Sequence, residues 1–319
     1  MKQKLQSQLE AHVQWTSPKI QNELIAIVSN MVLKRITSDV RNSAQYSIIV
    51  DETADIGRTE QVSLCLKYVF AGETKGTFVG FYTTASTEGE VLYELVKTSV
   101  NKLDLKLEDI VGKCFDGAAN MSCIHKGLAS RMKECSPLSI YVHCYGHLLN
   151  LALLDTITNV EPIRNALGTI QSLYNFLGAS PKHHRMFQDI EIDADHINLT
   201  LKSLSVTRWS CRWEAVKAAD EEMPRIIQAL LTLSKDRDPK TYTDSMALLN
   251  AICDFKFVFG LVVLKVIPSN TDSLSKYLQG KNMDVITARK TAGATIETLT
   301  KCRNEESFQL VWSRAEILS

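Results

Sequence analysis

The chain has 319 residues, enough for two domains or for one domain with a large insertion. Hydrophobic residues make up 45% of it, and the 36 basic residues balance the 36 acidic ones. A neutral chain does not attract nucleic acid through its net charge, so any such site must come from a local arrangement. The most apolar stretch, residues 257–264, falls far short of the roughly 20 residues that a membrane-spanning helix needs. The sequence therefore predicts no membrane role.

The eight cysteines form no C-x-x-C pair and no secretory pattern, and no apolar signal segment is visible at the start of the chain. This usage is typical of reduced thiols in an intracellular protein. The sequence therefore predicts a fold that depends on its core and not on a disulfide framework.

The first half of the chain mixes strands and helices. An amphipathic helix is predicted from Pro18, with Ser17 as its N-cap. The strands, the first three of which read as a meander of hairpins, are predicted over residues 46–51, 61–70, 77–84, 110–115 and 138–144. Further helices are predicted over 88–102, 118–135 (with a break near Gly127) and 145–158.

From residue 161 onward, apolar residues recur every three or four positions, which is the helical period. Helices are predicted over 213–234, 243–266, 284–302 and 307–318, joined by polar loops at 180–197, 235–242 and 268–273. We therefore expect a helical lead-in over 1–40, a mixed-sheet core over 41–160 and an all-helical region over 161–319. The order of strands and helices in the core matches an α/β, RNase H-like fold with a five-stranded mixed sheet and flanking helices.

Two predicted strands each end in an aspartate. The apolar run before Asp51 is rich in β-branched residues, and the run 110–115 leads directly into Asp116. Strands that deliver carboxylates to one edge of a sheet can hold a hard cation, and Mg²⁺ typically takes one or two carboxylates. The alternative is that Asp51 caps the following turn and that Asp116 begins a glycine-containing turn.

Four stretches, in this order, resemble hAT-superfamily transposases, and in particular transposon-derived proteins of the zinc finger MYM and THAP types. The stretches are Val50-Asp-Glu-Thr53, Cys114-Phe-Asp-Gly-Ala-Ala-Asn-Met121, Tyr141-Val-His-Cys-Tyr-Gly-His-Leu-Leu-Asn-Leu151 and Thr207-Arg-Trp-Ser210. The resemblance extends over about residues 17–317. It implies an RNase H-like DDE nuclease core interrupted by a large all-α insertion, with Mg²⁺ or Mn²⁺ as the cofactor, DNA as the partner and the nucleus as the location.

The resemblance also assigns residues. It places the first two catalytic, metal-binding acids on Asp51 and Asp116, and the family's C-x-x-H motif on Cys144 and His147. The family's third acid, a glutamate, and its C-terminal dimerisation segment follow the helical insertion, so both are expected beyond residue 319. We therefore expect this chain alone not to cut DNA, and a homo-oligomer would depend on that further segment.

Cys144 and His147 are three residues apart at a predicted strand-to-helix junction, so they share a face. On the resemblance, His147 contacts a DNA phosphate near the metal, with Cys144 in a supporting role. In a second reading Cys123, His125, Cys144 and His147 form a zinc set, but the spacing fits no standard finger and zinc is not expected. In the third, Cys144 packs in the core and His147 bonds a backbone carbonyl.

The resemblance places the family's Arg-Trp pair on Arg208 and Trp209. An indole can stack on an unpaired base, and an arginine can hold a phosphate. These two residues are therefore predicted to bind DNA ends or flipped bases, whereas the helical spacing of Trp213 predicts a core position. The alternative for the pair is that it packs in the helical region.

Three functional hypotheses follow. The first is a transposase core that processes DNA, active only when the further segment is present. The second is a domesticated nuclear regulatory or protein-interaction module without catalysis. The third is a metal-dependent RNase H-like nuclease unrelated to transposition.

Overall fold

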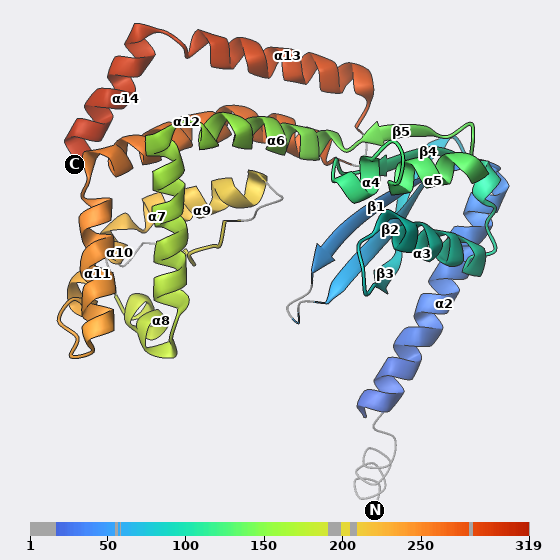
Figure 1. The fold of residues 1–319 in the computed structure, drawn as a ribbon, viewed down its shortest axis with the longest axis horizontal. Helices are drawn as coiled ribbons and strands as arrows, with labels where there is room; N and C mark the ends of the chain where they lie inside the picture. Colours follow the sequence, from blue (N-terminus) through green and yellow to red (C-terminus); the bar gives the residue numbers. More distant parts are fainter. Residues whose placement is uncertain are drawn as a thin grey trace, which may run out of the picture. The chain divides into compact units, whose positions relative to one another are not determined.

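A computed structural model describes residues 17–54, 57, 59–190, 199–204, 209–280 and 283–318. The chain divides into two compact units, Met1–Cys144 and Tyr145–Ser319 (Figure 1). The first unit holds the sheet, whereas every element of the second is a helix within the described ranges. Each unit is described below by itself.

The first unit is built on five strands: β1 (Tyr46–Ala54), β2 (Glu60–Phe70), β3 (Glu73–Thr83), β4 (Ile110–Phe115) and β5 (Ile140–His143). Their order across the sheet is β3-β2-β1-β4-β5. The meander β1-β2-β3 is antiparallel, while β4 pairs parallel to β1 and β5 pairs parallel to β4. This mixed sheet with flanking helices confirms the predicted RNase H-like fold class.

One face of the sheet carries the core of the first unit. Alternate residues of β1 and β2, such as Ile48, Val50, Leu64 and Leu66, are fully buried, as period-2 side-chain alternation requires. They pack with apolar residues of α2 (Pro18–Ser43), α3 (Gly89–Lys102) and α5 (Leu128–Cys135). The opposite face exposes apolar side chains, including Ile49, Phe78 and Phe81. The sheet is thus covered on one face by the unit's own helices.

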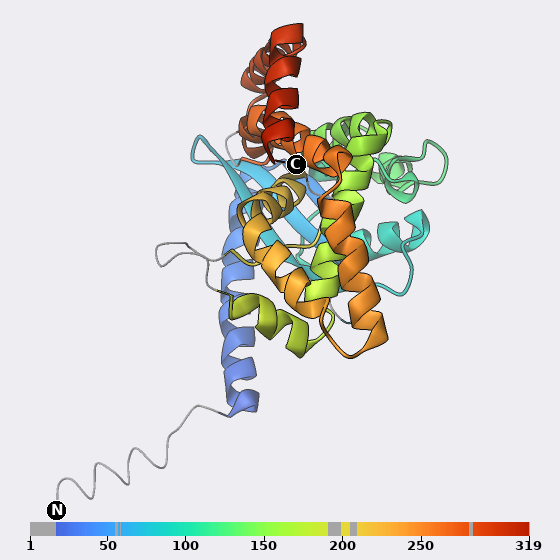
Figure 2. The same cartoon turned by 90° about the vertical axis from the view of Figure 1, so that its left-hand side faces the viewer.

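Helix α2 (blue in Figures 1 and 2) begins where the sequence predicts. The Ser17 Oγ accepts a hydrogen bond from the backbone N–H of Ile20 at 3.3 Å, which confirms the N-cap. The helix ends at Ala44, whose φ of 61° is left-handed. Its first half stands exposed, and the second half packs on the sheet through Ile36 and Val40.

The predicted helix over 118–135 is in fact two helices, α4 (Ala119–Ser122) and α5. They are separated by a tight turn at residues 123–127, where a Cβ on Gly127 would lie 2.6 Å from the backbone nitrogen of Cys123. The predicted break near Gly127 is confirmed, and its cause is this close approach of backbone to backbone.

The second unit contains α6 (Tyr145–Thr158), α7 (Glu161–Gly178), α8 (Pro181–Gln188), α9 (Trp209–Glu221), α10 (Met223–Leu233), α11 (Pro239–Ile252), α12 (Phe255–Leu278), α13 (Val285–Lys301) and α14 (Glu305–Leu318). The helices other than α13 contribute to one hydrophobic core, and Leu153, Leu154 and Ile157 of α6 are part of it. Because of these contacts α6 lies in the second unit, whereas the predicted core domain extended to residue 160.

No single helix in the described ranges is long and apolar enough to cross a membrane. Within these ranges, one pair of helices, α11 and the first part of α12, reaches that length and composition when taken together across a 65° bend. Their apolar side chains Ile252, Phe257, Leu261 and Leu264 are buried in the helical core, which accounts for the apolar character of this pair.

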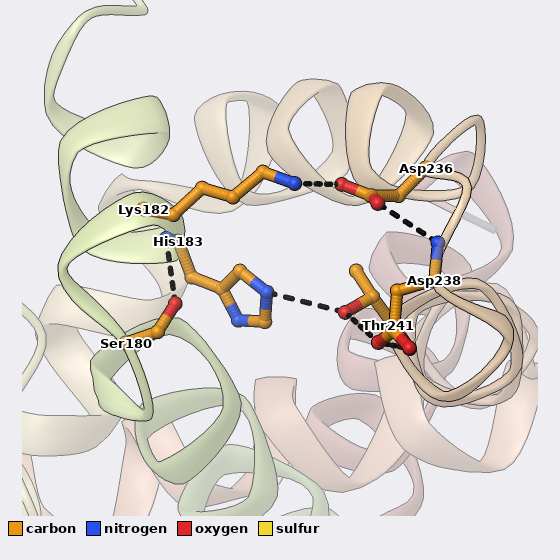
Figure 3. Close-up of polar contacts among 6 residues, drawn as sticks. All are labelled: Ser180, Lys182, His183, Asp236, Asp238 and Thr241. Carbon is orange, nitrogen blue, oxygen red and sulfur yellow. Dashed lines mark hydrogen bonds and ion pairs between the residues drawn. The ribbon is translucent and has the colours of Figure 1, made fainter.

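The stretch 180–197 is predicted to be a polar loop, and for residues 181–188 this is wrong. These residues form α8, capped by the Ser180 Oγ, which accepts from the backbone N–H of His183 at 3.1 Å (Figure 3). His183 is buried against Thr241, and Lys182 pairs with Asp236. These contacts tie α8 to the start of α11, so the segment has a structural role.

Candidate functional site

The two acidic strand ends belong to neighbouring parallel strands. The last paired residues of β1 and β4 are Ile49 and Cys114. Asp51 and Asp116 each follow two residues later, so a continued register brings them side by side at the carboxyl edge of the sheet. Asp51 is exposed and Asp116 is half-buried. This placement would allow the two carboxylates to share a cation, and the cation itself stays a prediction.

Glu52 adds a third carboxyl group to this edge. It follows Val50 on the core face, so its side chain points away from that of Asp51. The Asn120 Nδ2 donates to both carboxylate oxygens of Glu52, at 3.0 and 3.2 Å, and to the carbonyl of Thr87 at 2.8 Å. Asn120 therefore ties the end of β1 to the segment that follows Asp116.

Burial raises the pKa of Glu52 to about 7, against the opposing effect of the Asn120 hydrogen bond. The negative charges of Asp116, Glu60 and Asp51 raise it further. The alternation of side chains along a strand places Glu52 on the other face from Asp51, so the strand pattern alone assigns it no metal role. What marks Glu52 as part of this edge is its hydrogen bonding to Asn120, and the sequence alone does not show that these two residues are in contact.

Asp116 also performs the turn role that was left open. Its Oδ1 accepts from the backbone N–H of Ala118 at 3.2 Å, which is an Asx turn. The Tyr141 hydroxyl donates to the carbonyl of Asp116 at 3.0 Å. The two bonds hold the Asp116 backbone between β4 and β5. Because the Asx turn engages one of the two carboxylate oxygens, it is compatible with a role in binding a cation.

His143 is a further residue of this edge that sequence reasoning missed. It ends β5 opposite Phe115 of β4. Its imidazole lies against the turn after Asp116, because a Cβ on Gly117 would be 2.3 Å from the ring's Cε1 and 2.6 Å from Nε2. The position after Asp116 must therefore be glycine for the ring to fit.

Cys144 immediately follows β5 and is half-buried. Its backbone N–H donates to the carbonyl of Phe115 at 2.9 Å, which extends the pairing of β5 with β4 by one residue. Its side chain is hydrogen-bonded to the Cys114 thiol, and this bond together with burial raises the pKa of Cys114. Cys144 therefore contacts a second thiol in addition to packing beside the sheet.

The other predicted site residues lie in the second unit or outside the described residues. His147 is half-buried on α6, and its role beside the acids stays a prediction. Trp209 is the first residue of α9, but its side chain and all of Arg208 lie outside the described part of the chain. Trp213 packs against the helical core, as predicted.

Within the part of the chain that the structure describes, no three His, Cys, Asp or Glu side chains form a group that could hold a metal ion. A cation at Asp51 and Asp116 would therefore have at most two such ligands among the described residues. That matches the one or two carboxylates that Mg²⁺ commonly takes, with water and phosphate oxygens completing its shell.

The raised pKa of Glu52 predicts a pH-dependent stability. The folded state holds the proton up to about pH 7 and the unfolded chain only up to about 4.5, so the stability of the wild type should fall as pH rises between these values. Because Glu52 is only half-buried, solvent screens the penalty to about 1 kcal/mol. Glu52→Gln should remove this loss.

Urea denaturation at pH 4.5, 6 and 8 measures this effect, with Glu73→Gln at the exposed start of β3 as the control. The difference between Glu52→Gln and the wild type should grow in favour of the variant with rising pH. Parallel pH profiles for the two proteins would contradict the assignment.

Comparison with known proteins adds to this geometry. Residues 1–127 match the family model described as "ZMYM1/FAM200, RNase-like domain" (DUF4371). The chain is 26% identical over 303 residues to the human "52 kDa repressor of the inhibitor of the protein kinase", and 25% identical over 307 residues to the mouse protein of that name. Each match covers 92% of this chain but only 40% of the relative's length. Residues 1–127 are therefore similar to the ZMYM1/FAM200 RNase-like domains, which agrees with the predicted resemblance to transposon-derived zinc finger MYM-type proteins.

Proposed function

We propose that this chain is a DNA-binding module of hAT transposase descent that binds DNA together with a divalent cation but does not cut it. The observation that carries the proposal is the parallel pairing of β1 with β4, whose register directs Asp51 and Asp116 to one edge of the sheet. Two neighbouring carboxylates fit a Mg²⁺ or Mn²⁺ ion that also takes a DNA phosphate oxygen.

Strand transfer requires more than this pair supplies. In two-metal sites the ions are about 3.5–4 Å apart and stabilise both the attacking and the leaving oxygen, which takes about three carboxylates on a rigid frame. Glu52 does not complete such a set, because its carboxylate lies on the core face and is held by Asn120. Binding without cleavage is therefore the activity that these residues support best.

The test measures Mn²⁺ binding by calorimetry, and then DNA binding with and without Mn²⁺. Asp116→Asn and Asp51→Asn should each weaken Mn²⁺ binding by at least about tenfold, because each removes one of two charged ligands. Asp104→Asn, which changes an exposed aspartate of the same unit, is the matched control and should leave binding unchanged.

Two outcomes would refute parts of the proposal. Nicking of DNA that depends on Mg²⁺ or Mn²⁺ and disappears in Asp116→Asn would refute the absence of cleavage. DNA binding that is identical with and without Mn²⁺, and in both aspartate variants, would refute the cation site.

The DNA partner we propose is a single-stranded, flipped or hairpin end, held by Trp209 and Arg208 with His147 on a phosphate. Because stacking on an indole contributes about 1–3 kcal/mol per base, Trp209→Ala should weaken binding to such ends by about 5- to 100-fold and to plain duplex much less. An equal loss on both substrates would indicate a packing role for Trp209.

A regulatory, protein-binding role is the second candidate, and α2 favours it. The first half of this helix exposes a set of large apolar side chains: Leu24, Ile25, Ile27, Val28, Met31 and Val32. Exposed apolar patches of this kind mark interaction sites. The human relative is named a repressor, which agrees with a regulatory role. If the Val28→Lys variant lost binding to a protein partner but still bound Mn²⁺ as the wild type does, that result would support the protein-binding role.

A further inference from the structure

The face of the sheet opposite the core presents an aromatic pair on the edge strand β3. The ring centroids of Phe78 and Phe81 lie 4.9 Å apart, and the two residues are 50% and 59% exposed. Residues three apart on a regular strand point to opposite faces. Here the pairing of β2 with β3 shifts register between Leu64 and Cys65, which leaves Val79 as an extra residue. This bulge turns both rings to the same face, which is a recurrent use of bulges beside functional sites.

The strand register places this pair beside Asp51. Phe81 pairs with Ser63, and Ser63 pairs with Asp51, so the three side chains form one row across the open face. Because neighbouring strands lie 4.7–4.9 Å apart, about 10 Å separates the backbones at the two ends of this row. Phe78 lies in the next row, whose β1 member is Ile49. The aromatic pair therefore continues the surface that carries the proposed cation.

A positive charge lies at the other end of the pair. Lys67 of β2 follows Cys65 by two residues, so it lies on the open face one row beyond Phe78. From Asp51 to Lys67 the face therefore offers a cation site, two exposed rings and an ammonium group, in that order. A single-stranded nucleic acid presents phosphate, bases and phosphate in the same order. An apolar protein segment would match only the rings.

We propose that the open face stacks two consecutive bases of single-stranded DNA on Phe78 and Phe81, between a phosphate at the Asp51 cation and a phosphate at Lys67. The inference rests on the proposed function, because it assigns the face on which the same partner lies. Aromatic side chains on an open sheet stack unpaired bases in this way in RNA-recognition modules. Stacking requires an unpaired base, so a plain duplex offers nothing to the rings.

Fluorescence anisotropy of a labelled oligothymidylate strand, titrated with the full chain in the presence of Mn²⁺, tests this inference. Phe78→Leu and Phe81→Leu keep an apolar side chain but remove the ring, and each should weaken binding by about fivefold or more. Phe81→Tyr retains the ring and should bind within about twofold of the wild type. Val69→Ala changes an exposed residue of the same face beyond Lys67, and as the matched control it should leave the affinity unchanged.

The salt dependence supplies a readout that a packing role would not move. Each phosphate contact on a single strand contributes about 0.7 to the slope of log affinity against log salt concentration, so Lys67→Gln should lower the slope by about that amount. The leucine variants should keep the wild-type slope, because they remove no charge. They should also keep the wild-type melting midpoint, since both rings are exposed.

Unchanged single-strand affinity in both leucine variants would overturn the inference. Mn²⁺ binding, measured in the same variants, then shows separately whether the cation site of the proposed function stands, because neither ring belongs to that site. An equal loss of affinity in Phe81→Tyr and Phe81→Leu would also overturn the inference, since it would mean that the ring is not what binds the strand. A loss on plain duplex as large as that on the single strand would do the same.

Discussion

Replacing Arg225 with methionine should destabilise the helical unit by about 3–5 kcal/mol, because it leaves a buried carboxylate without its partner. The side chains of Arg225 and Glu222 are 3% and 0% exposed, and Nη1 of the arginine lies 3.0 Å from Oε2 of the glutamate. The guanidinium also donates to the carbonyls of Phe187, at 2.8 Å, and Gln188, at 3.2 Å. It lies 4.2 Å from the centroid of the Phe187 ring.

The loss is large because the arginine serves one carboxylate and two backbone carbonyls at once. Without the guanidinium, Glu222 keeps a hydrogen bond from the backbone N–H of Leu199, but its buried carboxylate loses the positive charge that lies 3.0 Å from it. The two carbonyls at the end of α8 lose their donors as well. Urea denaturation followed by far-UV circular dichroism measures the change in the free energy of unfolding.

A surface pair on α9 supplies the matched control. Lys217 and Glu221 are 54% and 43% exposed and lie 3.8 Å apart, so Lys217→Met should change stability by less than about 0.5 kcal/mol. The double variant Glu222→Gln with Arg225→Met should recover part of the loss, because no buried charge remains. A loss below about 1 kcal/mol in Arg225→Met would show that the pair is not a stabilising centre.

The strands could be predicted from sequence because their signals are local. Alternating or continuous apolar runs mark all five strands, and the chain order of elements restricts the sheet topology.

The boundaries of the helices were harder to predict than those of the strands. The pattern over 213–234 predicts one helix, but Pro224 at the start of α10 separates it from α9. The polar stretch 268–273 predicts a loop, yet α12 continues through it. Thr271 fits because it is buried and its hydroxyl donates to the Ile267 carbonyl.

The candidate site could be predicted only in part, because local sequence patterns do not show contacts between distant segments. Asp51 and Asp116 are recognisable because a carboxylate directly follows an apolar strand. Glu52 and His143 are not, since each depends on a residue from a distant segment. Glu52 is held by Asn120, 68 residues away, and His143 lies against Gly117. Periodicity identifies the face of a strand on which a side chain lies, but not which loop returns to contact it.

Gly117→Ala should destabilise the first unit by about 1–3 kcal/mol, the usual cost of inserting a methyl group into a packed site. The added Cβ would lie 2.3 Å from Cε1 and 2.6 Å from Nε2 of His143. The ring or the turn after Asp116 must move, and the Tyr141 bond to the Asp116 carbonyl opposes movement of the turn. Gly76→Ala is the matched control, because a Cβ there meets nothing within 4 Å.

A double-mutant cycle separates this clash from any effect on the backbone of the turn. His143→Ala removes the ring, so adding Gly117→Ala to that variant should cost less than about 0.5 kcal/mol. Thermal and urea unfolding of the four proteins give the coupling energy. Equal costs of Gly117→Ala with and without the imidazole would show that the glycine is required by the turn itself. A coupling of 1 kcal/mol or more would instead place the contact between β5 and the Asp116 turn among the interactions that hold this sheet edge together.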